Sequence, residues 1–324
     1  MTHHLSIPRP VVALACLSVL AAVGHGPVPA PESHAASASA LGSASEVASD
    51  VASDPSRAPA SSAEFFGAPF SADELPGLLN RLSVAPDAGP VPQVRSRRPD
   101  GYYDFYFTRA VYGGGGLGSR GFFGRGSWAV DYPKADRQFL VVLGETLDLL
   151  RVPSMENAVR LEDPRLREYP FLYTLEVGGM RLTPEQVEGL RNYLLAGGFL
   201  VVDDFWGAWE WRNFEEQMRR VFPGVEFVDL PLDHEIFHVF YDIEEILQVP
   251  NVNNAAAGVT SECGPCQPHV RGIFDDDGRL MVVINWNTDL GDAWEWSEQA
   301  VYPFKYSNFA YKMAVNFIVY AMTH

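Results

Sequence analysis

Two periods of apolar spacing alternate along the chain from residue 102 onward. Short apolar runs, typical of buried strands, are followed by stretches in which apolar residues recur every three or four positions, typical of helices. The predicted strands are Tyr102–Thr108, Val159–Leu161, Phe171–Glu176, 199–203, Val225–Val228, Val270–Phe274 and Leu280–Asn285. The predicted helices are Lys134–Leu150, 183–196, Ala208–Val221 and Asn308–Met322. Because strands alternate with helices, we expect an α/β fold with a doubly wound, mostly parallel sheet.

The clearest boundary signals surround the strand predicted at 199–203. The sequence Thr-Pro-Glu-Gln at 183–186 predicts a helix start, with Thr as the cap, Pro in the first turn and Gln closing a capping box. Gly197 predicts the end of that helix. The apolar strand that follows stops at two adjacent carboxylates, Asp203 and Asp204. A buried parallel strand of this kind delivers polar residues to its carboxyl edge, where ligands bind.

The first 100 residues lack this alternation. Val11–Val23 is a small-apolar run of the length found in secretory signals, so residues 1–40 are predicted to be a signal peptide and its processing region. Residues 41–100 are predicted to be a disordered linker and a transition segment, which leaves 101–324 as a single domain. We therefore expect an exported protein, periplasmic or secreted. It would be membrane-anchored only if the N-terminal segment stays uncleaved.

The net charge of the 324-residue chain is −17 at pH 7. Binding to the phosphates of a nucleic acid requires a basic surface, so the charge argues against a nucleic-acid partner. An acidic surface also serves solubility, so the charge alone does not identify a partner.

Carboxylates and tryptophans gather in two similar stretches, one after the strand at 199–203 and one after the strand at Leu280–Asn285. The candidate pocket residues are Asp203, Asp204, Trp206, Glu210, Trp211, Asp289, Asp292, Trp294 and Glu295. Clustered carboxylates can form an acid–base pair, suit sugars when they lie beside flat rings, or hold a hard cation such as Ca²⁺ or Mg²⁺. The competing interpretation is that the carboxylates cap helices and the tryptophans pack in the core.

The sequence His-Glu-Ile-Phe-His at 234–238 matches the pattern of zinc hydrolases. That chemistry requires a helix, on which both imidazoles face one Zn²⁺ and the Glu polarises a water. The residues around the motif favour extended structure, which indicates that His234 and His238 are structural or line a cleft.

Cys263 and Cys266 are separated by two residues in a loop rich in Asn, Ala and Gly. Two such thiols in an exported protein most often form a local disulfide, which is the pairing we expect here. With His269 they would also offer three ligands to a metal, which remains a lesser alternative.

Several motifs together resemble one bacterial family. They are Tyr106–Arg109, Trp128 with Asp131–Pro133, Asp163-Pro164 with Tyr169–Tyr173, Leu190–Leu194, Gly197–Leu200, Asp203–Gly207 and Gly291–Trp296. The family is known as domain of unknown function 4159, and the resemblance covers about residues 101–324. It implies a flavodoxin-like fold similar to that of class I glutamine amidotransferases, and it implies no established activity.

The resemblance also predicts where a nucleophile would lie. In class I amidotransferases a catalytic Cys follows a central strand on a sharp turn. The turns after the strands at 102–108, 199–203 and 280–285 carry no Cys, so glutaminase chemistry is not expected.

We therefore expect an exported protein that binds a small-molecule, glycan or envelope-protein ligand through an acidic cleft lined by tryptophan. The alternative is a hydrolase that acts on carbohydrate or a similar polar substrate through paired carboxylates. A further alternative is a zinc-dependent hydrolase that uses His234 and His238. A divalent metal is the one cofactor that these residues suggest.

Overall fold

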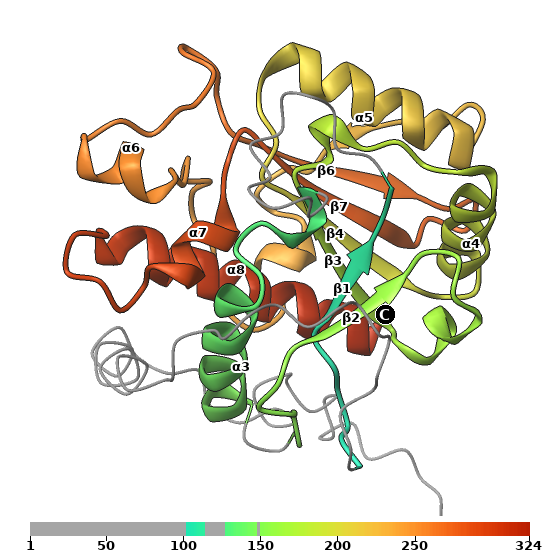
Figure 1. Cartoon of the computed structure of the whole chain (residues 1–324), viewed down its shortest axis with the longest axis horizontal. Coiled ribbons are helices and arrows are strands. Elements are labelled where there is room, and N and C mark those ends of the chain that lie inside the picture. Colours follow the sequence, from blue (N-terminus) through green and yellow to red (C-terminus); the bar gives the residue numbers. More distant parts are fainter. Residues whose placement is uncertain (1–101, 114–126, 148–149) are drawn as a thin grey trace, which may run out of the picture. The chain divides into compact units, whose positions relative to one another are not determined.

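Seven strands form one sheet in the order β2-β1-β3-β4-β7-β6-β5 (Figure 1). The computed structural model describes residues 102–113, 127–147 and 150–324. The strands are β1 Thr108–Val111, β2 Asn157–Arg160, β3 Phe171–Leu175, β4 Phe199–Asp203, β5 Val228–Asp229, β6 His269–Phe274 and β7 Leu280–Trp286. All neighbours from β2 to β7 are parallel, whereas β6 is antiparallel to both β7 and β5. The sheet is therefore mixed and mostly parallel.

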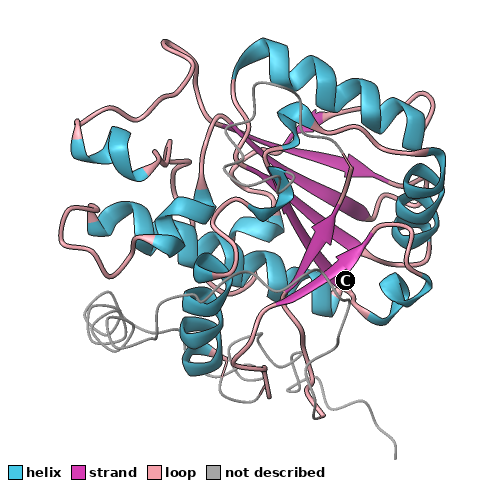
Figure 2. Cartoon of the chain, viewed as in Figure 1, coloured by secondary structure: helices cyan, strands magenta, loops and turns pink. Residues whose placement is uncertain are grey.

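The described residues form six α-helices, which cover both faces of the sheet (Figures 1 and 2). They are α3 Lys134–Thr146, α4 Pro184–Leu195, α5 Gly207–Val221, α6 Val252–Ala256, α7 Leu290–Glu295 and α8 Phe304–Thr323. Short 3-10 helices lie at Ser127–Ala129, Pro164–Glu168, Val177–Gly179 and Glu235–Phe237. The α/β class predicted from the sequence is confirmed.

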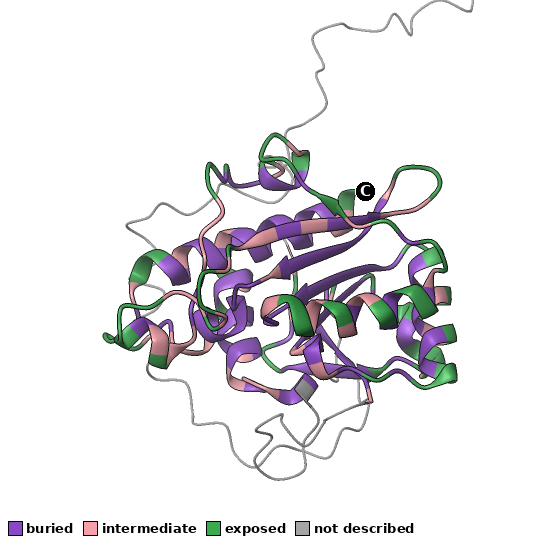
Figure 3. Cartoon of the chain, turned by 90° about the horizontal axis from the view of Figure 1, so that it is seen from above, coloured by how far each residue is buried: buried purple, intermediate pink, exposed green. Residues whose placement is uncertain are grey.

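Each face of the sheet has its own hydrophobic core. On one face α3, α7 and α8 contribute buried residues such as Phe139, Trp294 and Tyr311. On the other face α4 and α5 contribute Leu190 and Phe214. Figure 3 shows the strands as mostly buried, with exposed positions on the helices at the surface, such as α5. Because both faces are covered, only the strand ends and the loops after them can present polar residues to a ligand.

The helix start, helix end and strand predicted around β4 are all confirmed. Thr183 Oγ accepts a hydrogen bond from Gln186 N at 3.3 Å, and Gln186 Oε1 accepts one from Thr183 N at 3.2 Å, which completes the capping box of α4. Gly197 has a φ of 100°, a left-handed conformation that glycine adopts without steric cost. Strand β4 then begins at Phe199 and ends at Asp203.

Three strands differ from the simplest expectation. One is β5, which pairs with β6 only at Val228 and Asp229 instead of forming the strand predicted at Val225–Val228. The run at Tyr102–Thr108 was predicted as a strand, but β1 pairs with β2 only from Thr108 to Val111, because β2 supplies partners only there. Strand β6 is antiparallel because a short turn from Asp275 to Gly278 joins it to β7, and only antiparallel neighbours can be joined so closely.

The two edges of the sheet are short strands that carry charge. Strand β2 has four residues and ends in the exposed Arg160, and β5 has only two, Val228 and Asp229. Asp229 Oδ1 accepts a hydrogen bond from Arg271 Nε at 2.8 Å.

Parts of the sequence-based predictions fall on residues that are not described. The signal and linker predicted for residues 1–100 lie outside the described residues. Among the helices that are described, none is both long and apolar enough to cross a membrane.

Candidate functional site

Residues with a left-handed backbone gather at the carboxyl edge of the parallel strands. Asp131 (φ 59°), Glu176 (53°), Asp204 (47°) and Asn287 (61°) are the only non-glycine residues with positive φ among those described. They follow β1, β3, β4 and β7 respectively. This conformation costs a non-glycine residue on the order of 1–3 kcal/mol, and such strain clusters at functional sites. The carboxyl edge of the sheet is therefore the candidate functional site.

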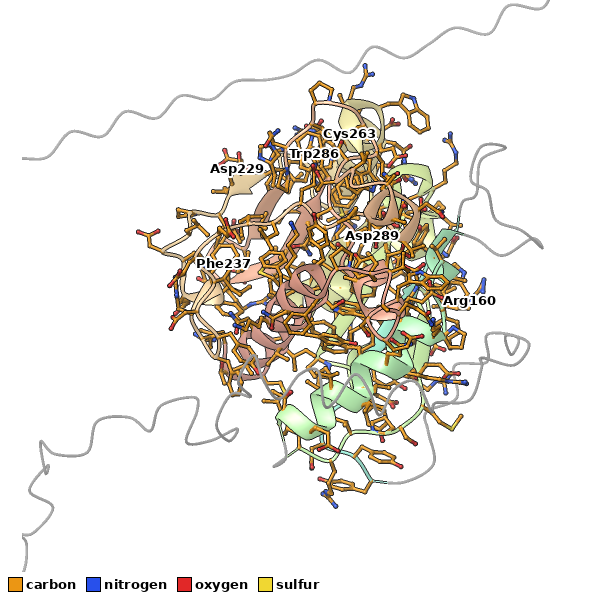
Figure 4. The ribbon with its side chains drawn as sticks, turned by 90° about the vertical axis from the view of Figure 1, so that its left-hand side faces the viewer. Arg160, Asp229, Phe237, Cys263, Trp286 and Asp289 are labelled. Carbon is orange, nitrogen blue, oxygen red and sulfur yellow. A yellow bond between two sulfur atoms is a disulfide. The ribbon has the colours of Figure 1, made fainter. Side chains whose placement is uncertain are left out.

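Two groups of three carboxylates meet at this edge. One carboxylate oxygen from each of Asp131, Asp289 and Asp292 lies within 4.8 Å of the other two. The same holds for Asp204, Glu262 and Asp289. We call these groups the inner triad and the outer triad. Asp289, labelled in Figure 4, belongs to both.

Arg109 holds the segment that carries Asp131. Its buried guanidinium forms an ion pair with Asp136 at 2.6 Å, and it donates to the carbonyl oxygens of Trp128 at 3.1 Å and Val130 at 2.5 Å. Because strand β1 fixes Arg109, the chain just before Asp131 is fixed as well.

Helix α7 brings the other two carboxylates of the inner triad together. Asp289 caps the helix, since its Oδ1 accepts a hydrogen bond from Asp292 N at 2.8 Å. Asp292 Oδ2 accepts one from Val252 N, at the start of α6, at 2.6 Å. Gly291 leaves room for the triad, because an added Cβ would lie 2.6 Å from Asp131 Oδ2.

Asp203 anchors α7 to the sheet. Its Oδ2 accepts hydrogen bonds from Tyr173 Oη at 2.6 Å, Leu290 N at 2.9 Å and Gly291 N at 3.1 Å. Burial raises the pKa of this fully buried carboxyl to about 7. Asp203 therefore positions α7, which carries Asp292, and belongs to neither triad.

Asp204 and Glu210 are held by a tryptophan between them. Asp204 Oδ1 accepts a hydrogen bond from Trp206 Nε1 at 2.9 Å, and Glu210 Oε2 accepts one from Trp206 N at 2.6 Å. Glu210 also packs on Gly178, where an added Cβ would lie 2.5 Å from its carboxyl carbon. The glycine after β3 thus lets the Glu210 side chain approach the edge closely.

A disulfide loop supplies the last member of the outer triad. Cys263 and Cys266 are joined by a disulfide, which is the pairing that their spacing suggested. Cys263 Sγ lies 3.4 Å from Asn287 Oδ1, so the loop rests on the segment after β7. Glu262, just before Cys263, accepts a hydrogen bond from Asn251 Nδ2.

The carboxylates of the edge strongly disfavour one another's ionisation. Burial, followed by repulsion from neighbouring carboxylates, raises the pKa of Asp131, Asp204 and Asp289 well above its ordinary value. The same causes raise the pKa of Glu176 and of Glu295 to about 7.

Basic side chains close to the edge are already paired elsewhere. The guanidinium of Arg109 binds Asp136, and the ammonium of Lys134 lies 3.0 Å from Glu298. Among the described residues, no ion pair involves a member of either triad. The negative charge of the triads is therefore not balanced by a bonded basic group.

The tryptophans do not line one wall. Trp206 is buried beside Asp204. Trp294 belongs to the core of the α3 face, where its ring lies 4.9 Å from that of Phe139. Trp211 packs on the opposite face, 4.8 Å from Trp286. Of the predicted pocket residues, the structure gathers Asp204, Asp289 and Asp292 in the triads and separates these rings. Three predicted carboxylates, Asp203, Glu210 and Glu295, belong to neither triad.

His234 and His238 lie at the two ends of a 3-10 turn instead of on an α-helix. His234 Nδ1 accepts a hydrogen bond from Ile236 N, and both ring nitrogens of His238 are within 3.0 Å of Asp242 and the Leu232 carbonyl. In the described chain these imidazoles share no group of metal-ligating atoms. The turn therefore does not reproduce the helix that zinc hydrolases use.

One sizeable cavity lies away from the triads. Its volume is about 600 Å³, and it lies beside Met281 at the start of β7, with Phe222 and Asp275 in its lining. No predicted pocket residue lines it. The carboxylates in its lining, such as Asp275 and Asp276, belong to neither triad.

Asp131, Glu176 and Glu262 are not among the pocket residues predicted from the sequence. The rule that indicated Asp203, a carboxylate directly after a buried strand, applies equally to Glu176 after β3. Asp131 and Glu262 stand in parts of the sequence without apolar periodicity, and only tertiary structure brings them to the edge.

Comparison with known proteins gives one family. The family model described as domain of unknown function (DUF4159) matches residues 112–322, which is well over half of the chain. None of the curated proteins matches the sequence.

Proposed function

The chain belongs to the DUF4159 family, and we propose that it binds a hard divalent cation at the inner triad and, through that cation, a polar ligand. One observation carries the proposal. Asp131 Oδ2 is buried and accepts no hydrogen bond from any described residue, although two more carboxylates lie beside it. A buried carboxylate oxygen without a donor requires a proton or a cation to offset its desolvation.

The residues favour Ca²⁺, Mg²⁺ or Mn²⁺ over Zn²⁺. The inner triad offers only carboxylate oxygens, and hard cations prefer oxygen ligands, whereas zinc sites are built mainly from Cys and His. Oxygens that bind one Ca²⁺ at about 2.3–2.6 Å lie at most about 5 Å apart, so three oxygens within 4.8 Å of one another can bind the same ion.

Three carboxylates leave coordination positions for a ligand. Ca²⁺ takes about six to eight oxygens and Mg²⁺ about six. We propose that water and a ligand rich in hydroxyl or carbonyl oxygens complete the shell, as a small polar molecule, a glycan or an envelope-protein surface would. The predicted signal peptide is consistent with such a partner outside the cytoplasm.

For the fold, we propose a flavodoxin-like sheet related to class I glutamine amidotransferases. The support is the sharp turn at Asp204, which follows the central strand β4 with a φ of 47°. Amidotransferases carry their nucleophilic Cys on a turn of this kind. A carboxylate at that turn supplies no thiolate, so glutaminase chemistry is not part of the proposal.

A hydrolase is the second candidate, and one observation favours it. Glu176 and Glu210 repel each other, and burial with this repulsion raises the pKa of Glu176 to about 7, within the range of a general acid or base. A glycan hydrolysed by the wild type and not by Glu176→Gln would support this candidate.

Titration calorimetry of the purified protein with Ca²⁺, Mg²⁺ and Mn²⁺ at pH 7.5 tests cation binding. We expect saturable binding that weakens by roughly 10–100-fold or more in Asp131→Asn, since even loss of an outer-shell partner costs that much. Asp276→Asn, at the exposed turn between β6 and β7, is the control and should bind as the wild type does. Absence of binding at millimolar cation would overturn the proposal.

A further inference from the structure

We infer that the acidic edge holds a pair of divalent cations, the second of them bound by the outer triad. The inference rests on the proposed function and deepens it, because Asp289 belongs to both triads and would be a ligand of both cations. The ligand of the outer triad is again a hard cation, since Asp204, Glu262 and Asp289 offer only carboxylate oxygens.

The outer triad has oxygens that accept no hydrogen bond from a described residue. Asp204 is 6% exposed and Asp289 is 3% exposed, so both are more than nine-tenths buried. Each accepts a hydrogen bond through Oδ1, Asp204 from Trp206 and Asp289 from Asp292. Neither Oδ2 accepts one from a described residue. Each of these two buried side chains therefore keeps one oxygen available to a cation held together with Glu262.

Charge favours two cations over one. The two triads contain five carboxylates in all, and within the described structure no basic side chain is paired with them. One divalent cation would leave three negative charges unbalanced in a largely buried cluster, whereas two would leave one. Because unpaired buried charge is costly, the ionised cluster is most stable with both positions filled.

The two positions differ in how they are built. Asp131, Asp289 and Asp292 are fixed by β1 and α7, next to the sheet. Glu262 is exposed and comes from the disulfide loop (Figure 4 labels Cys263). The outer cation should therefore bind more weakly and exchange faster than the inner one.

A shared carboxylate gives the pair a chemical use. In enzymes with two metals about 3.5–4 Å apart, the pair clamps the attacking and leaving oxygens of a displacement reaction. The same arrangement at this edge would hold a polar substrate and a water together between the cations, beside Glu176.

Counting bound Mn²⁺ by elemental analysis and calorimetry tests the pair. We expect two Mn²⁺ per wild-type chain, one in Glu262→Gln and one in Asp131→Asn. Asp289→Asn should lose both, while its helix cap survives because Asn caps as well as Asp. Asp276→Asn is the matched control and should keep two. Electron paramagnetic resonance should show magnetic coupling between the two Mn²⁺ ions in the wild type only.

The outcomes separate the two proposals. If the wild type binds a single Mn²⁺ that Glu262→Gln retains and Asp131→Asn loses, the second site is wrong and the proposed function stands. If two ions bind without magnetic coupling, Asp289 does not bridge them and the inference is overturned. If no Mn²⁺ binds, both proposals fail. Circular dichroism of each variant confirms that lost binding does not reflect lost folding.

Discussion

Asp289 caps helix α7 through one carboxylate oxygen. Its other carboxylate oxygen accepts no hydrogen bond from a described residue. Asp204 divides its oxygens in the same way, with Trp206 on one of them. Capping and ligand binding, which compete as interpretations of a sequence, are thus compatible in a single side chain. Asp203 differs from these residues by its position. Its Oδ2 accepts three hydrogen bonds, two of them from the start of α7, and although its Oδ1 also lacks a partner, Asp203 belongs to neither triad.

Gly291→Ala should block the inner triad while leaving the fold intact. Alanine favours a helix over glycine by about 1 kcal/mol, but its Cβ would lie 2.6 Å from Asp131 Oδ2. We expect at least tenfold weaker cation binding in calorimetry, with an unchanged or higher melting temperature. Gly144→Ala in α3, whose Cβ meets only Val152 at 3.2 Å, is the control. Unchanged affinity in Gly291→Ala would mean that Asp131 is not a ligand.

Arg109→Met should destabilise the protein strongly. It leaves Asp136 as an unpaired buried charge and releases the carbonyls of Trp128 and Val130. Breaking a buried ion pair costs about 3–5 kcal/mol, which urea denaturation would measure. Arg151→Met, which removes an exposed ion pair with Asp104, should change stability little. Equal effects of the two variants would contradict the role assigned to Arg109.

At the scale of elements, the sequence predicts the features that depend on interactions between residues close together in the chain. The capping box of α4 and the bounds of β4 followed from residues next to one another in the chain. The start of β1 did not, because pairing with β2 decides it. The outer triad could not be predicted either, since Glu262 lies in a loop whose path depends on the disulfide and on Asn287.

Removal of the disulfide should weaken the outer cation and spare the inner one. With Cys263→Ser and Cys266→Ser together, the loop loses its crosslink, so Glu262 must be ordered again whenever the cation binds. We expect the second Mn²⁺ to bind roughly tenfold more weakly in calorimetry, with the first unaffected. Wild-type affinity at both positions would indicate that Asn251 alone holds Glu262 in place.

At the scale of the molecule, the net charge of −17 is partly concentrated in one place. Carboxylates with raised pKa values destabilise the ionised folded state, because the unfolded chain can ionise them freely. The free energy of folding is thereby coupled to pH and, under our proposal, to cation concentration.

Without cations, the protein should be less stable at pH 8 than at pH 5. The pKa of Glu176 and of Glu295 is about 7 in the folded protein and 4.5 ordinarily. Between these values the folded chain binds more protons than the unfolded chain, so stability falls as pH rises, by up to about 1.4 kcal/mol per pH unit for each group. Thermal melts with a chelator should record this loss, and excess Ca²⁺ or Mn²⁺ should reverse it at pH 8. A melting temperature that stays constant across this range would contradict the raised pKa values.

The short, charged edge strands bear on how the protein behaves at high concentration. A sheet with a long, bare outer strand can grow by adding strands of other molecules, the route to fibrils. Here one end stops at Arg160 and the other is two residues long, with Asp229 tied to Arg271. Neither edge strand offers a long row of unpaired backbone groups to a second copy of this chain. High concentration should therefore not lead to fibrils built by adding strands at the edges of the sheet.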